Sequence, residues 1–341
     1  MALSEKTKSY LKYALASQEV ADEVIAYLEA DATLETQLLS HIAAPDAHPQ
    51  YLKKGTAVWC VQGGEYASLQ DAIDAASTGQ TVIVGEGSWG DATLKGGVNI
   101  VGLGAPRNTN ISVGQLSFAP TSGNVLQNEI FLSNLFVNPS AANSGIVLGG
   151  TAPVRLSMSG CYVYKGSGAV PAVVATNTDP TFTSLKMDNC IVLFATATGT
   201  SINSSARYFK FANSEISGGD RALIVAGGLA QVAFSNIEVN NSTSEIITVN
   251  SGTIETTSAS LVRNLSAGGS GFFVDVGATI VVSTMTTFDI ADGSGYCVRG
   301  SGAVIYDSIS FSDIPVIQPR NTKFQDTLTV IQLPMTPTIS P

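Results

Sequence analysis

Two glutamates, Glu215 and Glu238, are the side chains whose type and spacing best suit acid–base chemistry. Each stands two residues after an asparagine in a similar short run, NSEI at 213–216 and NIEV at 236–239. If these runs stack in adjacent turns of a solenoid, the two backbones lie roughly 4.8 Å apart. Carboxylates this close raise the pKa of one partner, which can then act as a general acid beside a nucleophile. Retaining glycosidases use such a pair at about 5–5.5 Å.

The alternative is that both glutamates are solvated surface side chains that splay apart, and we favour this interpretation. A sugar site needs aromatic or arginine side chains around the carboxylates to hold the substrate. The nearest candidates are only Arg207, Tyr208, Lys210 and Arg221. The sequence therefore favours a protein without enzymatic activity, and glycoside hydrolysis remains the alternative.

A second group of candidate residues is apolar. Phe136, Tyr162 and Ile191 occupy the same place in three successive repeats as the glutamates do in later ones. Apolar side chains on an otherwise polar outer surface mark a contact with a subunit or a ligand. We favour a subunit contact over a platform for stacking sugars.

Other catalytic chemistry finds little support in the sequence. Both histidines, His41 and His48, precede the repeats, so no histidine-dependent triad can come from the repeats themselves. The four cysteines show no CxxC pairing and are expected to be buried and unpaired: Cys60, Cys161, Cys190 and Cys297. No aspartate cluster of the kind that binds calcium is visible. We expect neither a metal nor a cofactor.

The charge and hydropathy of the chain exclude two classes of partner. The formal charge is −10, from 27 acidic and 17 basic residues, and no run of Lys or Arg is present. A nucleic-acid partner is not expected, because neutralising phosphates requires clustered cations. The sequence contains no run of 18 consecutive apolar residues, so we do not expect insertion into a membrane. The first residues lack the apolar stretch of a signal peptide, so we expect synthesis in a cytoplasm.

Internal repeats predict the fold. A short motif with an anchor residue, usually Asn, recurs every 23 to 29 residues, at Asn134, Gly160, Asn189, Asn213, Asn236, Asn264 and Thr287. Such a period suits one turn of a parallel β-helix. We therefore predict an all-β solenoid of about ten rungs over residues 58–314.

The positions after each anchor predict which side chains are buried. One residue on stand Leu135, Cys161, Cys190, Ser214, Ile237, Leu265 and Phe288, and three residues on stand Val137, Val163, Val192, Ile216, Val239, Ala267 and Ile290. The residue between them tolerates polar side chains, which is the period of two expected for a strand with one buried face. The anchor asparagines fit tight turns that need a left-handed residue. They are scaffold residues in this interpretation.

The start of the repeats carries a resemblance to a known fold family. Residues 66–76 predict a short amphipathic helix, and residues 81–89 predict a strand followed by a glycine turn. This unit resembles the entry to the pectate-lyase-like right-handed parallel β-helix, where a helix covers the open end of the solenoid. Such a cap is needed because the end turn would otherwise expose an unpaired sheet edge and an open core.

The two ends of the chain differ from the repeats. Residues 1–44 predict helices whose apolar stripe suits attachment or oligomerisation, with Leu11, Leu15, Val24, Leu28, Leu34 and Leu38 as the contact residues. Prolines at 45 and 49 make residues 45–57 a linker. Residues 315–341 are rich in proline and predict an extended C-terminal arm.

The complete plan resembles bacteriophage virion proteins. The run HPQYL at 48–52 resembles a segment found near the start of phage tail-fibre and tailspike proteins, and residues 3–23 are similar to leaders of phage head-fibre and structural proteins. The resemblance implies a homotrimer on the virion surface, made in the host bacterial cytoplasm and bound to another virion protein through its N-terminal segment. It also implies host attachment, with a host surface glycan as a candidate ligand.

Tailspikes of this kind often cleave surface polysaccharide, and this sequence departs from them. The predicted solenoid is short and its acidic residues are sparse, and only 7% of the residues of the whole chain are aromatic. We therefore favour a non-enzymatic head or tail fibre, a decoration protein or an adhesin. The alternatives are a tailspike depolymerase that uses Glu215 and Glu238, and a non-viral secreted pectin-lyase-like enzyme.

Overall fold

The computed structural model describes residues 57–60, 66–104, 110–176, 183–196, 199–239, 245–257, 260–264, 270–282, 287–290, 298–307 and 328–333. The chain divides into two compact units, Met1–Ala57 and Val58–Pro341. The predicted helical segment 1–44, with its six contact residues from Leu11 to Leu38, lies outside the described residues, as does the linker up to residue 56.

A short helix opens the first turn, as residues 66–76 predict. Helix α4 (Leu69–Ala75) begins at Ser68, whose Oγ accepts a hydrogen bond from the backbone N–H of Asp71. Its C-terminal end is held by Lys95, whose Nζ donates to the backbone oxygens of Asp74 and Ala76. The helix buries Leu69, Ala72 and Ile73 and packs against β2 (Thr81–Val84) and β4 (Ala92–Thr93).

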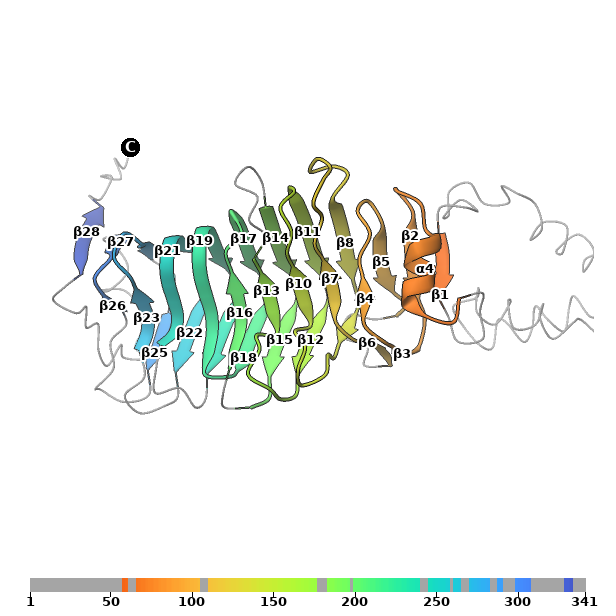
Figure 1. Cartoon of the computed structure of the whole chain (residues 1–341). Helices are drawn as coiled ribbons and strands as arrows, with labels where there is room; N and C mark the ends of the chain where they lie inside the picture. The colour runs from red at the N-terminus through yellow and green to blue at the C-terminus, as the bar shows by residue number, and fades with distance from the viewer. Residues whose placement is uncertain are drawn as a thin grey trace, which may run out of the picture. The chain divides into compact units, whose positions relative to one another are not determined.

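Each turn of the solenoid contributes one strand to each of three faces (Figure 1). Face 1 holds β2, β5 (Asn99–Gly102), β8 (Glu129–Ser133), β11 (Val154–Ser159), β14 (Thr183–Asp188), β17 (Tyr208–Ala212), the ends of β19 (Arg221–Ala233) and β21 (Glu245–Thr257), β24 (Thr279–Val282), β27 (Ala303–Asp307) and β28 (Thr329–Leu333). Strand β1 (Ala57–Cys60) pairs with β2.

The other two faces follow in chain order within each turn. Face 2 is a separate sheet made of β3 (Gly87–Trp89), β6 (Ile111–Val113), β9 (Phe136–Val137), β12 (Tyr162–Lys165), β15 (Ile191–Phe194), β18 (Glu215–Gly218), β20 (Asn236–Val239), β22 (Leu261–Asn264) and β25 (Thr287–Ile290). Face 3 holds β4, β7 (Leu116–Phe118), β10 (Ile146–Leu148), β13 (Val173–Ala175), β16 (Thr200–Ser204), the beginnings of β19 and β21, β23 (Ser270–Val274) and β26 (Val298–Gly300).

Neighbouring turns pair through parallel strands, which confirms the predicted all-β parallel solenoid. The described residues make fewer complete turns than the ten expected from the sequence, since face 2 has nine strands. Strand β28 lies in the segment predicted as a C-terminal arm, where it pairs in parallel with β27 and extends face 1. No helix in the described part of the chain is long and apolar enough to cross a membrane.

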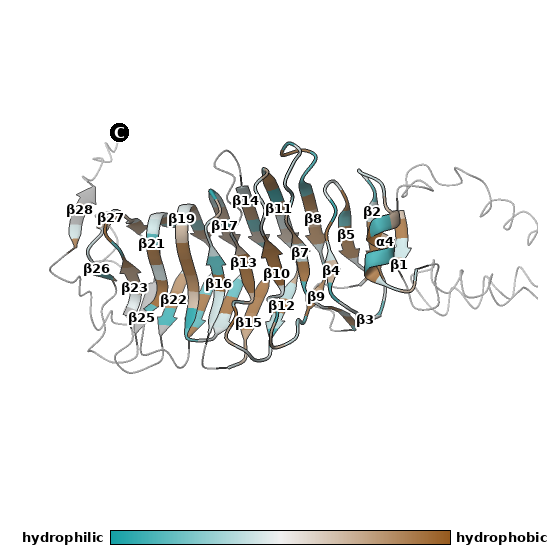
Figure 2. Ribbon diagram, in the orientation of Figure 1, coloured by the Kyte–Doolittle hydropathy of each residue, from teal (hydrophilic) through white to brown (hydrophobic). Residues whose placement is uncertain are grey.

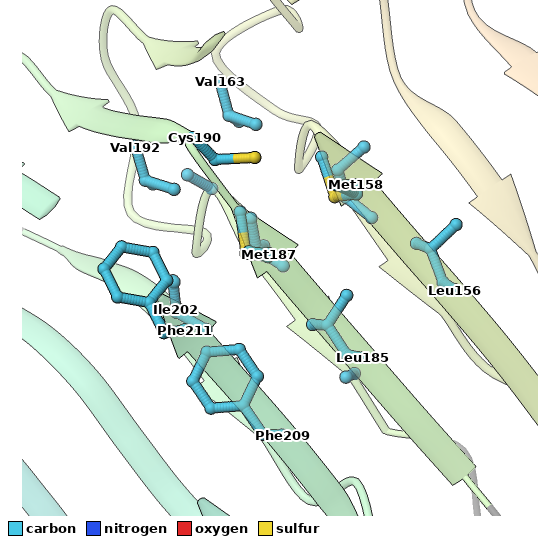
Figure 3. Close-up of a cluster of buried hydrophobic side chains, with 14 of the residues drawn as sticks. Leu156, Met158, Val163, Leu185, Met187, Cys190, Val192, Ile202, Phe209 and Phe211 are labelled. Carbon is cyan, nitrogen blue, oxygen red and sulfur yellow. The ribbon is translucent and has the colours of Figure 1, made fainter. Parts of the chain in front are cut away.

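Stacked side chains of the same kind fill the core. Alternate residues of β11 point inward, and Leu156 and Met158 are buried there. In the next two turns the same inward positions hold Leu185 and Met187, then Phe209 and Phe211. These side chains lie above one another inside the solenoid (Figure 3), and brown apolar residues recur in the strands, interrupted by teal polar ones (Figure 2). This stacking removes apolar surface from water at every turn.

The corner between faces 1 and 2 has the predicted conformation in four successive turns. Asn134, Asn189 and Asn213 have φ of 54°, 51° and 49°, and Gly160 has φ of 63°. This left-handed conformation is tolerated best by Gly and Asn. The prediction that these asparagines are scaffold residues is thus supported by their backbone geometry.

In the following turn the predicted register is wrong by two residues. The left-handed residue there is Phe234, with φ of 49°, and Asn236 pairs with Glu215 instead of Asn213. The misalignment continues, because Asn264 pairs with Ile290. The residues that follow the corner are therefore Ser235 and Ser260 in place of the predicted Ile237 and Leu265.

The corrected register reveals a column of small polar side chains inside this corner. Cys161, Cys190, Ser214 and Ser235 are all buried, and each donates a hydrogen bond from sulfur or oxygen to the backbone carbonyl two residues earlier. Ser260 continues the column and donates to the backbone oxygen of Val232. The cysteines thus play the same structural part as the serines.

Candidate functional site

The two predicted catalytic glutamates do not lie opposite each other. Glu215 pairs in register with Asn236, and Glu238 pairs with Ser217 on the neighbouring strand. The two glutamates are therefore offset by two residues along the strands, because the corner before β20 is Phe234 and not Asn236. The direct pairing that would have produced a general acid beside a nucleophile is not formed.

Glu238 is engaged by an arginine from the next turn. Its Oε2 accepts a hydrogen bond from Nη1 of Arg263 at 3.2 Å, and the two residues are register partners. The side chain of Glu238 is only 21% exposed, so solvent screens this pair less than a fully exposed one. Glu238 is thus held in an ion pair on the outer surface of face 2. Asp289 is the next position in register, at the backbone level.

Two further carboxylates are held by arginines, and the sequence analysis did not single them out. Glu129 on β8 pairs with Arg155 on β11 at 3.1 Å. Glu245 is almost fully buried and is held by Arg299, with a second guanidinium, that of Arg221, 4.0 Å away. A buried carboxylate needs such partners, because an unpaired charge in the protein interior is costly.

The predicted apolar residues form a continuous patch on the outer surface of face 2. Phe136, Tyr162 and Ile191 are direct register partners in three successive strands. The structure adds Tyr164 and Leu193, which occupy the next outward column. The ring centroid of Phe136 lies 5.2 Å from that of Tyr162 and 6.2 Å from that of Tyr164. We call these five residues the face 2 patch.

A groove lies on the outer surface of face 1. It encloses about 370 Å³ and is lined by Thr78, Gly79, Gly97, Asn99, Leu126, Glu129, Ile130, Phe131 and Ser157. Leu126 and Phe131 are 69% and 38% exposed. This groove has no signal in the sequence, because its lining comes from three strands and three connecting segments far apart in the chain.

Two of the three described thiols, those of Cys60 and Cys190, have a raised pKa and are poor nucleophiles, whereas the hydrogen bond with Cys190 lowers the pKa of the buried Cys161. Burial, with the negative charge of Asp71, raises the pKa of Cys60 to about 11. The hydrogen bond to Cys161 and burial raise the pKa of Cys190. Cys60, Cys161 and Cys190 are buried and free of disulfides, as predicted, and Cys297 lies outside the described residues. Since the thiolate is the reactive form, these cysteines serve the core.

Lys165 is a charged side chain in the interior of the solenoid. It is fully buried at the end of β12, and its Nζ donates hydrogen bonds of 2.6–2.8 Å to the backbone oxygens of Ser140, Ala141 and Asn143. Burial lowers the pKa of this lysine. Because all three donors are used, Lys165 fastens the segment between β9 and β10 and does not face a ligand.

Neither a search for metal-binding clusters nor comparison with known proteins assigns a function to this chain. Within the described ranges, no group of three or more His, Cys, Asp or Glu side chains could hold a metal ion. The chain matches no protein-family model, and no curated protein matches it. The parallel β-solenoid with its face 2 patch and face 1 groove is therefore the basis for assigning a role.

Proposed function

We propose that this chain is a structural protein of a bacteriophage particle, a homotrimeric head or tail fibre or spike without enzymatic activity. In this role residues 1–44 attach to another virion protein, and the solenoid is displayed on the virion surface for decoration or host attachment. The resemblance of the sequence to phage fibre proteins supports the proposal that the chain comes from a bacteriophage. The right-handed sense of the solenoid and its extension to about ten rungs belong to the same proposal.

The face 2 patch is the observation that carries the proposal of a trimer. Five large apolar side chains gather on one outer face, in two columns that run along the solenoid axis. Copies of the chain that lie side by side along a common axis would cover these columns together. Burying aromatic side chains of this size stabilises an interface by removing apolar surface from water.

The test of the trimer is the mass of the full-length protein in solution. Light scattering should give three times the mass of 35.3 kDa. Changing Tyr162 and Ile191 to arginine should shift the mass to that of a monomer, because the charges must be desolvated at the contact. The matched control is Ile224→Arg, which places the same charge at a half-buried outward position of face 3. A monomeric wild-type protein, or equal dissociation by the control, would contradict the assignment.

The virion location is tested separately. Mass spectrometry of purified particles, from a phage whose genome encodes this chain, should detect it at a copy number divisible by three. Antibodies against the solenoid should label the particle surface in electron micrographs. Its absence from particles that are otherwise complete would refute the structural role.

A tailspike depolymerase that uses Glu215 and Glu238 is the competing proposal. The offset of the two glutamates and the Arg263–Glu238 ion pair weaken its geometric basis. Incubating the protein with host capsule or O-antigen distinguishes the two proposals. Release of reducing ends by the wild type and its loss in Glu238→Gln would support the depolymerase.

A further inference from the structure

The face 1 groove continues into a single outward column along the solenoid. Phe131 pairs in register with Ser157, Ser157 with Lys186, and Lys186 with Lys210. Because adjacent parallel strands are roughly 4.8 Å apart, these side chains form a straight row along the axis. The row therefore combines an exposed ring, a hydroxyl and two ammonium groups on one surface.

The two lysines of this row stand beside each other without a carboxylate. In the described part of the chain, no acidic oxygen lies within 4.0 Å of either ammonium group. The nearest acids in register are Asp188, which accepts a hydrogen bond from Asn213 at 2.8 Å, and Glu255, which accepts one from Gln231 at 2.8 Å, and neither forms an ion pair with the lysines. Like charges directly opposite each other on a sheet are destabilising. In a chain of net charge −10 this arrangement places two ammonium groups side by side without an ion pair to either.

The groove at the other end of the row has a different composition. Phe131 presents an exposed ring, and the Oδ1 of Asn99 is fixed by the backbone N–H of Phe131 at 3.0 Å. This hydrogen bond leaves the amide nitrogen of Asn99 directed away from that contact. The polar lining also includes the hydroxyls of Thr78 and Ser157 and the carboxylate of Glu129, which is paired with Arg155 at 3.1 Å. An apolar ring with a few polar groups around it suits a ligand that has both a flat apolar side and hydroxyls.

We propose that this row binds an acidic glycan, with carboxylates of the sugar chain on Lys186 and Lys210 and a sugar ring against Phe131. The inference deepens the host-attachment part of the proposed function and rests on it for its biological meaning. A nucleic acid fits less well, because two cations neutralise too few phosphates for stable binding. The ligand carboxylate also removes the repulsion between the two ammonium groups.

The experiment measures binding of the full-length protein to immobilised alginate, a polyuronate, with dextran as a neutral glycan and polyphosphate as a polyanion without sugar. Lys186→Gln and Lys210→Gln should each weaken alginate binding about tenfold, and raising the salt concentration should weaken wild-type binding. The matched control is Arg263→Gln, which removes one positive charge from face 2 and should leave binding unchanged. Phe131→Ala should weaken binding without altering its salt dependence.

A second readout separates a binding role from a structural one. The double variant Lys186→Gln/Lys210→Gln should melt at the same temperature as the wild type or slightly higher at low salt, because the repulsion is gone. Equal alginate affinities of the double variant and the Arg263→Gln control would overturn the proposal. So would equal affinity for dextran, or binding of polyphosphate as tight as that of alginate. These assays use purified protein and do not depend on the virion assignment. The virion assignment can therefore fail while glycan binding is confirmed, and glycan binding can fail while the virion assignment is confirmed.

Discussion

The turns before and after β19 pass from face 3 to face 1 in different ways. In the earlier turns separate segments, such as residues 119–128 and 149–153, connect the two faces. In β19 and β21 a single strand runs through this corner without a break, and glycines with positive φ, Gly228 and Gly252, make the bend. The turns after β21 again use separate strands, joined by short segments such as residues 275–278. The earlier turns thus carry projecting segments, and the later ones have a smoother surface at this corner.

The features that could bind other molecules follow the same division. The face 1 groove uses the segment 119–128 through Leu126, and the face 2 patch spans β9 to β15. The later turns offer ion pairs such as Glu238–Arg263 on their outer surface. The same solenoid backbone therefore carries an apolar patch and a groove in some turns and ion pairs in others. This is possible because outward side chains contribute little to the packing of the core and can vary in type.

The largest loss of stability is expected when Lys165, which holds the segment between β9 and β10, is replaced. Lys165→Met should lower the free energy of unfolding by roughly 4 kcal/mol, because three buried backbone carbonyls lose their donor. Urea denaturation followed by circular dichroism measures this. The control Lys210→Met removes an outward lysine and should change stability by about 0.5 kcal/mol or less. Similar losses in both variants would show that the buried position is not special.

A glycine of a later turn should give the next largest effect. Gly252 has φ of 82°, and an added Cβ would meet the backbone oxygen of Gly228 at 2.3 Å. Gly252→Ala should therefore cost roughly 3 kcal/mol from strain and crowding. The neighbouring Gly227→Ala is the matched control, since its Cβ would find no atom closer than 3.7 Å. If both variants unfold at the same urea concentration, the bend does not depend on glycine.

The smallest effect tests the corner between faces 1 and 2. Phe234→Asn should stabilise the protein by about 1 kcal/mol, because asparagine tolerates the left-handed conformation better than phenylalanine. The same exchange in reverse, Asn213→Phe, should destabilise it by a similar amount. Melting temperatures of the two variants provide the measurement. A destabilised Phe234→Asn would mean that the exposed ring makes a contact that offsets its strain.

Local rules allowed much of the fold to be predicted. The alternation of apolar and polar residues identified the strands, and the amphipathic pattern of residues 66–76 identified α4. The asparagines at 134, 189 and 213 identified the left-handed corners. These signals depend on neighbours in the sequence, so a single chain is enough to read them.

The candidate sites were predicted less completely. Phe136, Tyr162 and Ile191 were found because they share one column, whereas Tyr164 and Leu193 were missed in the adjacent one. The groove around Phe131 and Asn99 had no sequence signal, because connecting segments of different length bring its lining together. The Lys186–Lys210 pairing likewise depends on the register between two turns.

The sequence by itself determined that the chain forms a parallel solenoid and which side chains point inward. Only the tertiary structure decided which residues of one turn lie beside which residues of the next. The physical reason is the period of two in a strand: a shift of two residues keeps every inward side chain inward. Ile237 is buried in either register, so the apolar pattern could not reveal that Glu238 lies beside Ser217 and Arg263, two residues away from Glu215.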